Sequence, residues 1–504
     1  MKSESAYPPL LRQTLDHALA YLEALPEAPV AATTSLEELR ARLGKPLPAA
    51  PVDALVVVDQ LVRDLAGGLT HSSGGRFFSW VIGGKLPASL AADWLTATWD
   101  QNAGMFAVAP AAAVVEEVSG RWLLDLLHLP STANFALVTG CQMAHVTCLA
   151  AARNAVLAAK GWDVEQRGLI GAPPIRVLSG DQRHGTIERA VRLLGLGRDC
   201  VIDNATDENG QLRAGPLRAA LARTPAAAHI VLLQAGDLNT GSFDPYDEII
   251  PVAREFDAWV HVDGAFGLWA AARPEYRHFT KGVENADSWA TDGHKWLYVP
   301  YDSGFAFVAN REAHYRSMAH HAAYLDHSAV ARDQVDWNPE YSRRGRGFPP
   351  TPQSPALVAR GSRRWLPSAA STPTPWSPAP ANCRGSKCCM CPISTRACCA
   401  FQIPRPERPK TITIAAPKPS LRASSLQARP TSPAPPGGGG AACGFRSAAA
   451  RPTPRTSRAP SPRSATRSEC GVPAIVPGSD DCRPSAITDW PSLVDPERSA
   501  SRSA

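Results

Sequence analysis

The chain has 504 residues, 44% of them hydrophobic, and a formal net charge of +6. This composition predicts a soluble globular protein with room for roughly two to four domains. The charge is unevenly spread, because residues 1–348 contain 31 Lys and Arg against 39 Asp and Glu, whereas residues 349–504 contain 21 against 7. The positive excess belongs to the second part alone, so it gives no reason to predict nucleic-acid binding.

The first part contains three cysteines, Cys141, Cys148 and Cys200. They are too few for a disulfide framework, which favours a reducing compartment. The first thirty residues carry no long apolar core of a secretory signal. No window approaches about eighteen uninterrupted apolar residues, the length that a membrane span needs. We therefore expect a cytoplasmic protein without a membrane partner.

Residues 1–84 predict short helices. Leucines recur at helical spacing from Leu10 to Leu25, and Leu55–Leu65 forms a second amphipathic piece. Such helices cannot bury their apolar faces alone and are expected to pack on a larger body or a partner subunit. The glycine-rich loop Thr70–Gly84 follows and carries Trp80. Its aromatic residues either pack locally or form a substrate wall.

Residues 85–348 alternate between strand-like and helical segments, after a predicted helix at Ala112–Leu129. The predicted strands are Phe135–Thr139, Ile175–Ser179, Val201–Asn204, His229–Gln234, Ala258–Asp263, Asp287–Thr291 and Gly304–Val308. Helices are predicted at Met143–Lys160, Thr186–Leu194, Pro216–Ala222 and Tyr246–Phe256. This alternation predicts an α/β domain with a mostly parallel sheet. Ligands of such sheets bind at the C-terminal ends of the strands.

Two residues at such ends suggest a cofactor. Asp263 closes one apolar run, and Lys295 follows another in the segment SWATDGHKW. Pyridoxal phosphate needs a lysine for its Schiff base and an acid beside its pyridine nitrogen. Burial would lower the pKa of Lys295 and favour the neutral amine. Alternatively, Lys295 is a solvated loop residue and Asp263 caps the next element.

Two further segments fit a phosphate-bearing cofactor. The turn Thr139–Gln142 precedes a helix, whose N-terminus could bind a phosphate, although any strand–turn–helix junction has this form. Cys141 could instead be a reactive thiol, but we find no nearby Cys/His pattern for a metal site or a protease dyad. His184 stands where a strand gives way to a helix. It is either a structural residue or an imidazole over the cofactor.

In chain order, the motifs TGCQMAH, SGDQRH, QAGDLNTGSFDP, HVDGAFG and DSWATDGHKW resemble the pyridoxal-phosphate-dependent group II amino-acid decarboxylases. The resemblance covers about Leu10 to Phe348. It implies fold type I, the aspartate aminotransferase-like architecture of these transferases. It also implies a homodimer whose N-terminal helices wrap the partner, which suits residues 1–84, and a C-terminal small domain.

The resemblance assigns roles to individual residues. Lys295 would form the Schiff base, Asp263 would pair with the pyridine nitrogen, and His184 and Ala265 would face the two sides of the ring. Further positions match residues around the cofactor and its phosphate, or the substrate. The first group is Cys141, Gln142, Ser288 and His294, and the second is Trp80 with Asn102, the latter from the neighbouring subunit.

Three positions depart from the family pattern. Cys141-Gln142-Met143 replaces a small pair followed by Glu, Asp237 stands where Thr is common, and Asp292 stands where Asn is common. A carboxylate beside a phosphate dianion is costly unless Asp292 points away or binds a donor. The departures leave the cofactor prediction in place but do not identify a particular substrate.

Residues 349–504 break the pattern. They hold 28 of the 47 Pro and 9 of the 12 Cys, whereas every His and Tyr precedes residue 342. Pro at this density prevents helices and central strands. One hypothesis is a disordered basic tail, and another is a metal site formed by the cysteines from Cys383 to Cys399. Their adjacent pairs match no usual ligand spacing, so we expect no metal.

The third hypothesis for this tail is a shift of the reading frame near Phe348. The abrupt loss of His and Tyr with a surge of Arg, Pro, Ser and Cys favours it. The family's small domain would then be missing or out of frame. Retranslating the underlying DNA in the other two frames tests this, since finding only stops would end the hypothesis.

The resemblance implies decarboxylation of an L-amino acid to an amine and carbon dioxide. One alternative is another lyase, aldolase or aminotransferase with the same cofactor, because the choice of reaction depends on which bond stands perpendicular to the ring. A second alternative is an inactive remnant that lacks the C-terminal domain and only binds partners.

Overall fold

The computed structural model of the chain describes residues 6–320 and 331–351. Both segments belong to the compact unit Met1–Thr411. The predicted tail, apart from its first three residues, lies outside the described residues. None of the described helices is long and apolar enough to cross a membrane.

Seven strands form one sheet in the order β1-β7-β6-β5-β4-β2-β3. Their bounds are β1 Asn134–Val138, β2 Ile175–Gly180, β3 Val201–Asn204, β4 Ala228–Gln234, β5 Trp259–Asp263, β6 Ser288–Asp292 and β7 Gly304–Val308. Six of the seven strands run in the same direction, and β7 runs antiparallel to its neighbours β1 and β6. The prediction of a mostly parallel sheet is therefore confirmed.

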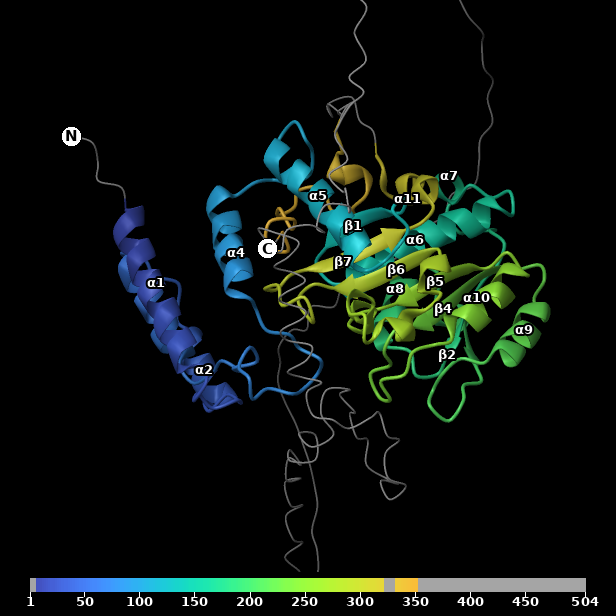
Figure 1. Cartoon of the computed structure of the whole chain (residues 1–504). Helices are drawn as coiled ribbons and strands as arrows, with labels where there is room; N and C mark the ends of the chain where they lie inside the picture. The colour runs from blue at the N-terminus through green and yellow to red at the C-terminus, as the bar shows by residue number, and fades with distance from the viewer. Residues whose placement is uncertain (1–5, 321–330, 352–504) are drawn as a thin grey trace, which may run out of the picture. The chain divides into compact units, whose positions relative to one another are not determined.

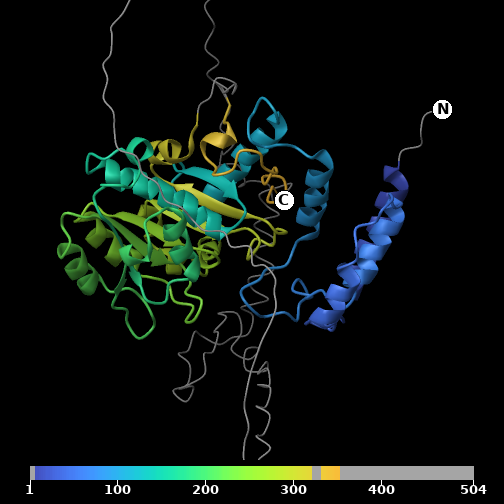
Figure 2. The same cartoon turned by 180° about the vertical axis from the view of Figure 1, so that it is seen from behind.

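Helices cover both faces of this sheet (Figures 1 and 2). One apolar core holds residues of α6 Cys141–Ala158, α8 Gly185–Leu193 and α11 Arg311–Met318. The other holds residues of α5 Pro110–Leu126, α9 Ala214–Ala222 and α10 Tyr246–Arg254. Alternate residues of the strands enter the two cores. Leu232 packs on the α6 side, whereas its neighbours Val231 and Leu233 pack on the other.

The remaining helices are α1 Tyr7–Ala24, α2 Leu36–Leu43, α3 Ala54–Leu65, α4 Pro87–Trp99 and α7 Val164–Arg167. Pro87 and Pro110 start α4 and α5, where a missing backbone N–H costs nothing. The helices α1, α2 and α3 contain no buried residue. Their apolar side chains are consequently left open to solvent in the single chain.

Candidate cofactor site

The sheet brings Asp263 and the segment before Lys295 to neighbouring strand ends. Asp263 is the last residue of β5 and pairs with Ala290 of the parallel strand β6. β6 ends at Asp292, and His294 and Lys295 follow in the next turn. The structure therefore places Asp263 and Lys295 at the ends of adjacent strands, as the sequence predicted.

Lys295 forms an ion pair that sequence analysis did not anticipate. Its Nζ lies 3.1 Å from Oδ2 of Asp292, and the side chain is 21% exposed. Burial alone would lower the pKa of Lys295, but Asp292 together with Cys141 and Asp263 outweighs it and raises this pKa. The prediction of a lowered lysine pKa is therefore wrong, because it left the neighbouring carboxylate out.

Asp292 holds several donors together at the start of α6. Its Oδ1 accepts a hydrogen bond from the backbone N–H of Cys141 at 2.5 Å and lies 3.4 Å from Nε2 of His294. The His294 ring stacks on Tyr301 at 4.1 Å between centroids. Of the two arrangements expected for Asp292, pointing away or binding donors, the second is observed. One N–H of the α6 N-terminus is thereby occupied.

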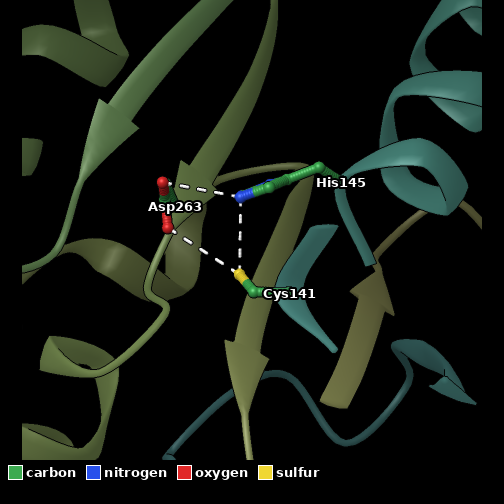
Figure 3. A group of neighbouring side chains, drawn as sticks. All are labelled: Cys141, His145 and Asp263. Carbon is green, nitrogen blue, oxygen red and sulfur yellow. Dashed lines mark hydrogen bonds and ion pairs between the residues drawn. The ribbon is translucent and has the colours of Figure 1, made fainter. Parts of the chain in front are cut away.

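Asp263 lies in a buried cluster with Cys141 and His145 (Figure 3). Its Oδ1 accepts from the backbone N–H of Ala265 at 3.1 Å and lies 3.8 Å from the Cys141 Sγ, and its Oδ2 lies 3.5 Å from Nε2 of His145. Burial raises the pKa of Asp263, but His145, the Ala265 N–H and Lys295 outweigh it and hold this pKa well below its usual range. The carboxylate is charged at neutral pH.

A line of polar side chains continues behind His145. Its Nδ1 lies 2.9 Å from Nε2 of His261, and Nδ1 of His261 lies 2.9 Å from Oγ of Ser288. Ser288 Oγ also accepts from the indole N–H of Trp259 at 2.9 Å. Both histidines and Ser288 are fully buried. Ser288, expected beside the cofactor, starts β6 and reaches Asp263 only through the two histidines.

Sequence analysis missed His145 and His261, although both had a local signal. Cys141 and His145 are four residues apart on a helix, and His261 and Asp263 are two apart on a strand, so each pair shares a face. What the sequence does not give is the packing of α6 against β5, which joins the two pairs.

Cys141 does have a histidine beside it, which the sequence analysis did not use. Sγ of Cys141 is 3.4 Å from Nε2 of His145. Burial, Asp263 and Asp292 raise the pKa of Cys141 well above its usual range, so the thiol stays protonated and is not an activated nucleophile. The polar atoms of Cys141, His145 and Asp263 lie within 4.8 Å of one another, a spacing that hydrogen bonds explain.

His184 and Gln142 meet at the start of α8. His184 is the N-cap residue, and its Nδ1 accepts the backbone N–H of Thr186. A neutral His184 therefore carries its proton on Nε2. The pKa of His184 is lowered, mainly because the ring is partly buried. Asp263 opposes this shift, and Lys295 adds to it. Gln142 donates from Nε2 to the Thr186 carbonyl at 3.2 Å.

The two predicted substrate residues are on the surface. Trp80 is 78% exposed, and exposed Asn102 accepts from the backbone N–H of Arg343 at 3.2 Å. The loop that carries Trp80 nevertheless approaches the lysine. A Cβ at Gly83 would lie 2.0 Å from the Lys295 carbonyl oxygen, so only glycine fits there.

Comparison with known proteins identifies this arrangement. Residues 37–348 match the pyridoxal-dependent decarboxylase conserved domain. The chain is 29% identical over 304 residues to a 4-hydroxyphenylacetaldehyde synthase of Rhodiola rosea, covering 58% of this chain and 61% of that one. It is 27% identical over 303 residues to an aromatic-L-amino-acid decarboxylase of Bacillus atrophaeus, covering 60% and 61%. The chain thus spans about three fifths of the length of these relatives.

Solved structures share the fold. The crystal structure of Oryza sativa TDC with PLP and tryptamine superimposes with a TM-score of 0.67 at 24% identity, covering 74% of this chain and 79% of that chain. Mouse CSAD gives 0.67 at 23% identity, covering 73% and 77%. The fold type I prediction is confirmed by these matches and by the seven-stranded sheet.

The residues at the strand ends fit pyridoxal phosphate. The cofactor needs a charged acid for its ring nitrogen, and Asp263 is such an acid with its side chain 10% exposed. It also needs an amine for its aldehyde, which Lys295 offers. The α6 N-terminus supplies backbone N–H groups, although Asp292 occupies the one on Cys141.

Proposed function

Because the chain belongs to the pyridoxal-dependent decarboxylase family, we propose that it decarboxylates an L-amino acid with pyridoxal 5'-phosphate bound at Asp263 and Lys295. The observation that carries the proposal is the pair of adjacent strand ends in β5 and β6, which present a buried charged carboxylate and a lysine on one edge of the sheet. The relatives named above support the choice of reaction.

The bound cofactor supplies an electron sink for the electron pair that the departing carboxylate leaves on the substrate. Asp263 would pair with the ring nitrogen and keep a proton on it. Ala265, whose backbone N–H donates to Asp263, would lie beside the ring. His184 presents Nε2–H, because its Nδ1 is engaged by Thr186, and can donate a proton on the substrate side.

Asp292 holds Lys295 in place. Its Oδ2 lies 3.1 Å from Nζ and stabilises the ammonium form, so the amine must lose a proton before it reacts. The same ion pair orients the lysine toward the edge of the sheet. His294 and the Cys141 N–H hold the other oxygen of Asp292 and fix the carboxylate.

The proposal includes a homodimer in the cytoplasm. Apolar residues of α1 and α3 are exposed, among them Leu15 at 42%, Leu19 at 46% and Leu61 at 52%. Apolar surface of this extent on two neighbouring helices is typical of a protein–protein interface. A second copy of the chain would cover it. Trp80 and Asn102 are proposed to lie near the substrate in that assembly, where the partner surrounds them.

The test is uptake of cofactor and release of carbon dioxide. Lys295→Ala is expected to abolish the visible absorbance band of the covalently bound cofactor and to lower turnover by at least about a thousandfold. Lys281→Ala is the matched control, because Lys281 pairs with Asp247 on the surface and is 77% exposed. A band that survives Lys295→Ala would contradict the assignment of the lysine.

A panel of L-amino acids decides the reaction class. Release of carbon dioxide with formation of an amine supports the decarboxylase. Transfer of the amino group or cleavage of another bond, without carbon dioxide, would point to the other reactions of this cofactor. Cofactor binding with no turnover of any amino acid would point to a remnant.

A further inference from the structure

We propose that His145 is a positioning residue that donates a hydrogen bond from Nε2 to Asp263 and fixes this carboxylate opposite the cofactor's ring nitrogen, with His261 and Ser288 setting the orientation of that donor. The inference rests on the proposed function, since it requires the cofactor at Asp263. It concerns a side chain to which neither the sequence motifs nor the family match gives a role.

The contacts place His145 behind Asp263. Nε2 lies 3.5 Å from Oδ2 of Asp263, and Nδ1 lies 2.9 Å from Nε2 of His261. The two imidazole rings meet edge to face, with centroids 5.2 Å apart and planes at 86°. His145 has no exposed surface, so it acts on the cofactor through Asp263.

The donors and acceptors along the chain can be counted. Trp259 offers only a donor, so Ser288 Oγ accepts from it. If the Ser288 hydroxyl donates to Nδ1 of His261, that ring carries its proton on Nε2 and donates to Nδ1 of His145. Neutral His145 then has its proton on Nε2, which faces Asp263. Every bond in this arrangement is satisfied and directed toward the carboxylate.

The opposite arrangement allows two states of His145. If His261 donates from Nδ1 to Ser288, its Nε2 accepts from Nδ1 of His145. His145 then either donates to Asp263 from Nε2 as a cation, or leaves Nε2 without a proton and accepts there from the Cys141 thiol. The second state sets a nitrogen lone pair 3.5 Å from a charged carboxylate, which is unfavourable, so we infer that Nε2 carries a proton. Burial lowers the pKa of His261 to about 3, so His261 carries one proton in either arrangement.

Charge explains why such a donor matters to the cofactor. Asp263 is buried and also interacts with Cys141 and the Ala265 N–H. A buried carboxylate without a strong donor takes up a proton, and a protonated Asp263 could no longer attract a proton to the ring nitrogen. Removing His145 should therefore weaken only the interactions that involve this nitrogen.

The experiment compares two cofactors on the full chain. Pyridoxal phosphate and its 1-carba analogue, in which CH replaces the ring nitrogen, are titrated into apoprotein, and dissociation constants are measured. His145→Leu is expected to weaken binding of pyridoxal phosphate by about 10- to 100-fold, the loss of one hydrogen bond to a charged group. Binding of the analogue should change by less than about threefold, because it has no ring nitrogen to lose.

His145→Gln is the matched variant, since the amide can place an N–H near the position of Nε2. It should restore most of the preference for pyridoxal phosphate. An equal loss for both cofactors would show that His145 only supports packing and would overturn the inference, as would unchanged binding of both. Should the Leu variant not fold, His145→Met fills the space without a donor and replaces it.

A second readout needs no variant. With pyridoxal phosphate labelled with ¹⁵N in the ring, the nitrogen of the wild-type complex should show the chemical shift of a protonated pyridine and keep it to high pH. An unprotonated ring nitrogen at neutral pH would overturn the inference. Failure of the wild-type chain to bind either cofactor would instead count against the proposed function, which keeps the two proposals separable.

Discussion

Helix α6 and the N-terminal helices α1, α2 and α3 differ in how much of themselves they bury. Twelve of the 18 residues of α6 are buried, whereas none is buried in the 38 residues of the other three. α6 is apolar over most of its length and carries one charged residue, Arg153, whereas α1, α2 and α3 each carry three or four charged residues beside their leucines. The difference teaches that a helix that is apolar on most sides predicts its own burial, whereas an amphipathic pattern predicts a helix but not what covers it. α6 packs against the sheet, whereas the apolar side chains of the N-terminal helices stay partly exposed in the single chain.

The two regions also hold their charges differently. In the α/β domain, Arg343 and Glu116 are both fully buried, and two hydrogen bonds of 2.8 Å join them. Arg343 also donates to the carbonyl oxygens of Leu137 and Ala103. In the N-terminal region, Lys45 pairs with Asp64 at 2.6 Å, with the lysine side chain 44% exposed. The first pair anchors the last described segment to the domain.

The largest effect should come from breaking the buried pair. Arg343→Met is expected to lower the free energy of unfolding by about 3–5 kcal/mol, because Glu116 is left charged and unpaired in the core. Lys45→Met should lower it by less than about 1 kcal/mol, since this pair is open to water at the lysine. Chemical denaturation of both variants measures the difference. Equal losses would contradict the contrast between the two regions.

Truncating one leucine in each region gives the next effect. Leu157→Ala in α6 removes a fully buried side chain and should cost about 2–5 kcal/mol of unfolding free energy. Leu61→Ala in α3, 52% exposed in the single chain, should change the unfolding of dilute protein by less than about 0.5 kcal/mol. The same change should weaken self-association, which sedimentation at several concentrations detects. A dimer unaffected by Leu61→Ala would place the interface elsewhere.

The sequence predicted the elements well because their signals are local. Val201–Asn204 and Gly304–Val308 are strands with the predicted bounds, and Ala258–Asp263 differs from β5 by one residue. The helix predicted from Met143 begins earlier, at Cys141, because Gly140 serves as its N-cap. Apolar runs and turn residues suffice for such predictions.

Sequence analysis predicted the residues of the site that lie at strand ends, but not the contacts between them. Asp263 and Lys295 needed no more than their positions after apolar runs. The direction of the Lys295 pKa shift required knowing that Asp292 turns toward the amine. The contact of His145 with His261 joins residues 116 apart in sequence through the packing of α6 on β5. No local sequence pattern predicts a contact between residues so far apart in the chain. For this reason the line of polar side chains behind Asp263 was missed.

The smallest effect concerns pH and a buried histidine of the domain. His314 is fully buried between Asn134 and the Trp337 carbonyl, and burial together with Arg332 lowers its pKa to about 3. The unfolded chain binds a proton near pH 6.5 and the folded chain does not, so stability falls as pH drops from 6.5 toward 3. His314 should contribute a loss of about 2 kcal/mol between pH 6.5 and 5.

His314→Gln tests this contribution, because the amide cannot titrate. Its unfolding free energy should be lower than that of the wild type at pH 7, since the paired ring is lost, but should fall less steeply on acidification. The slope should be smaller by about 1.4 kcal/mol per pH unit between pH 6 and 4. Leu61→Ala, in the region without buried residues, should keep the wild-type slope. If the His314→Gln protein kept the wild-type slope, His314 would have to be protonated in the folded domain. The buried site would then accept a charge, contrary to this prediction.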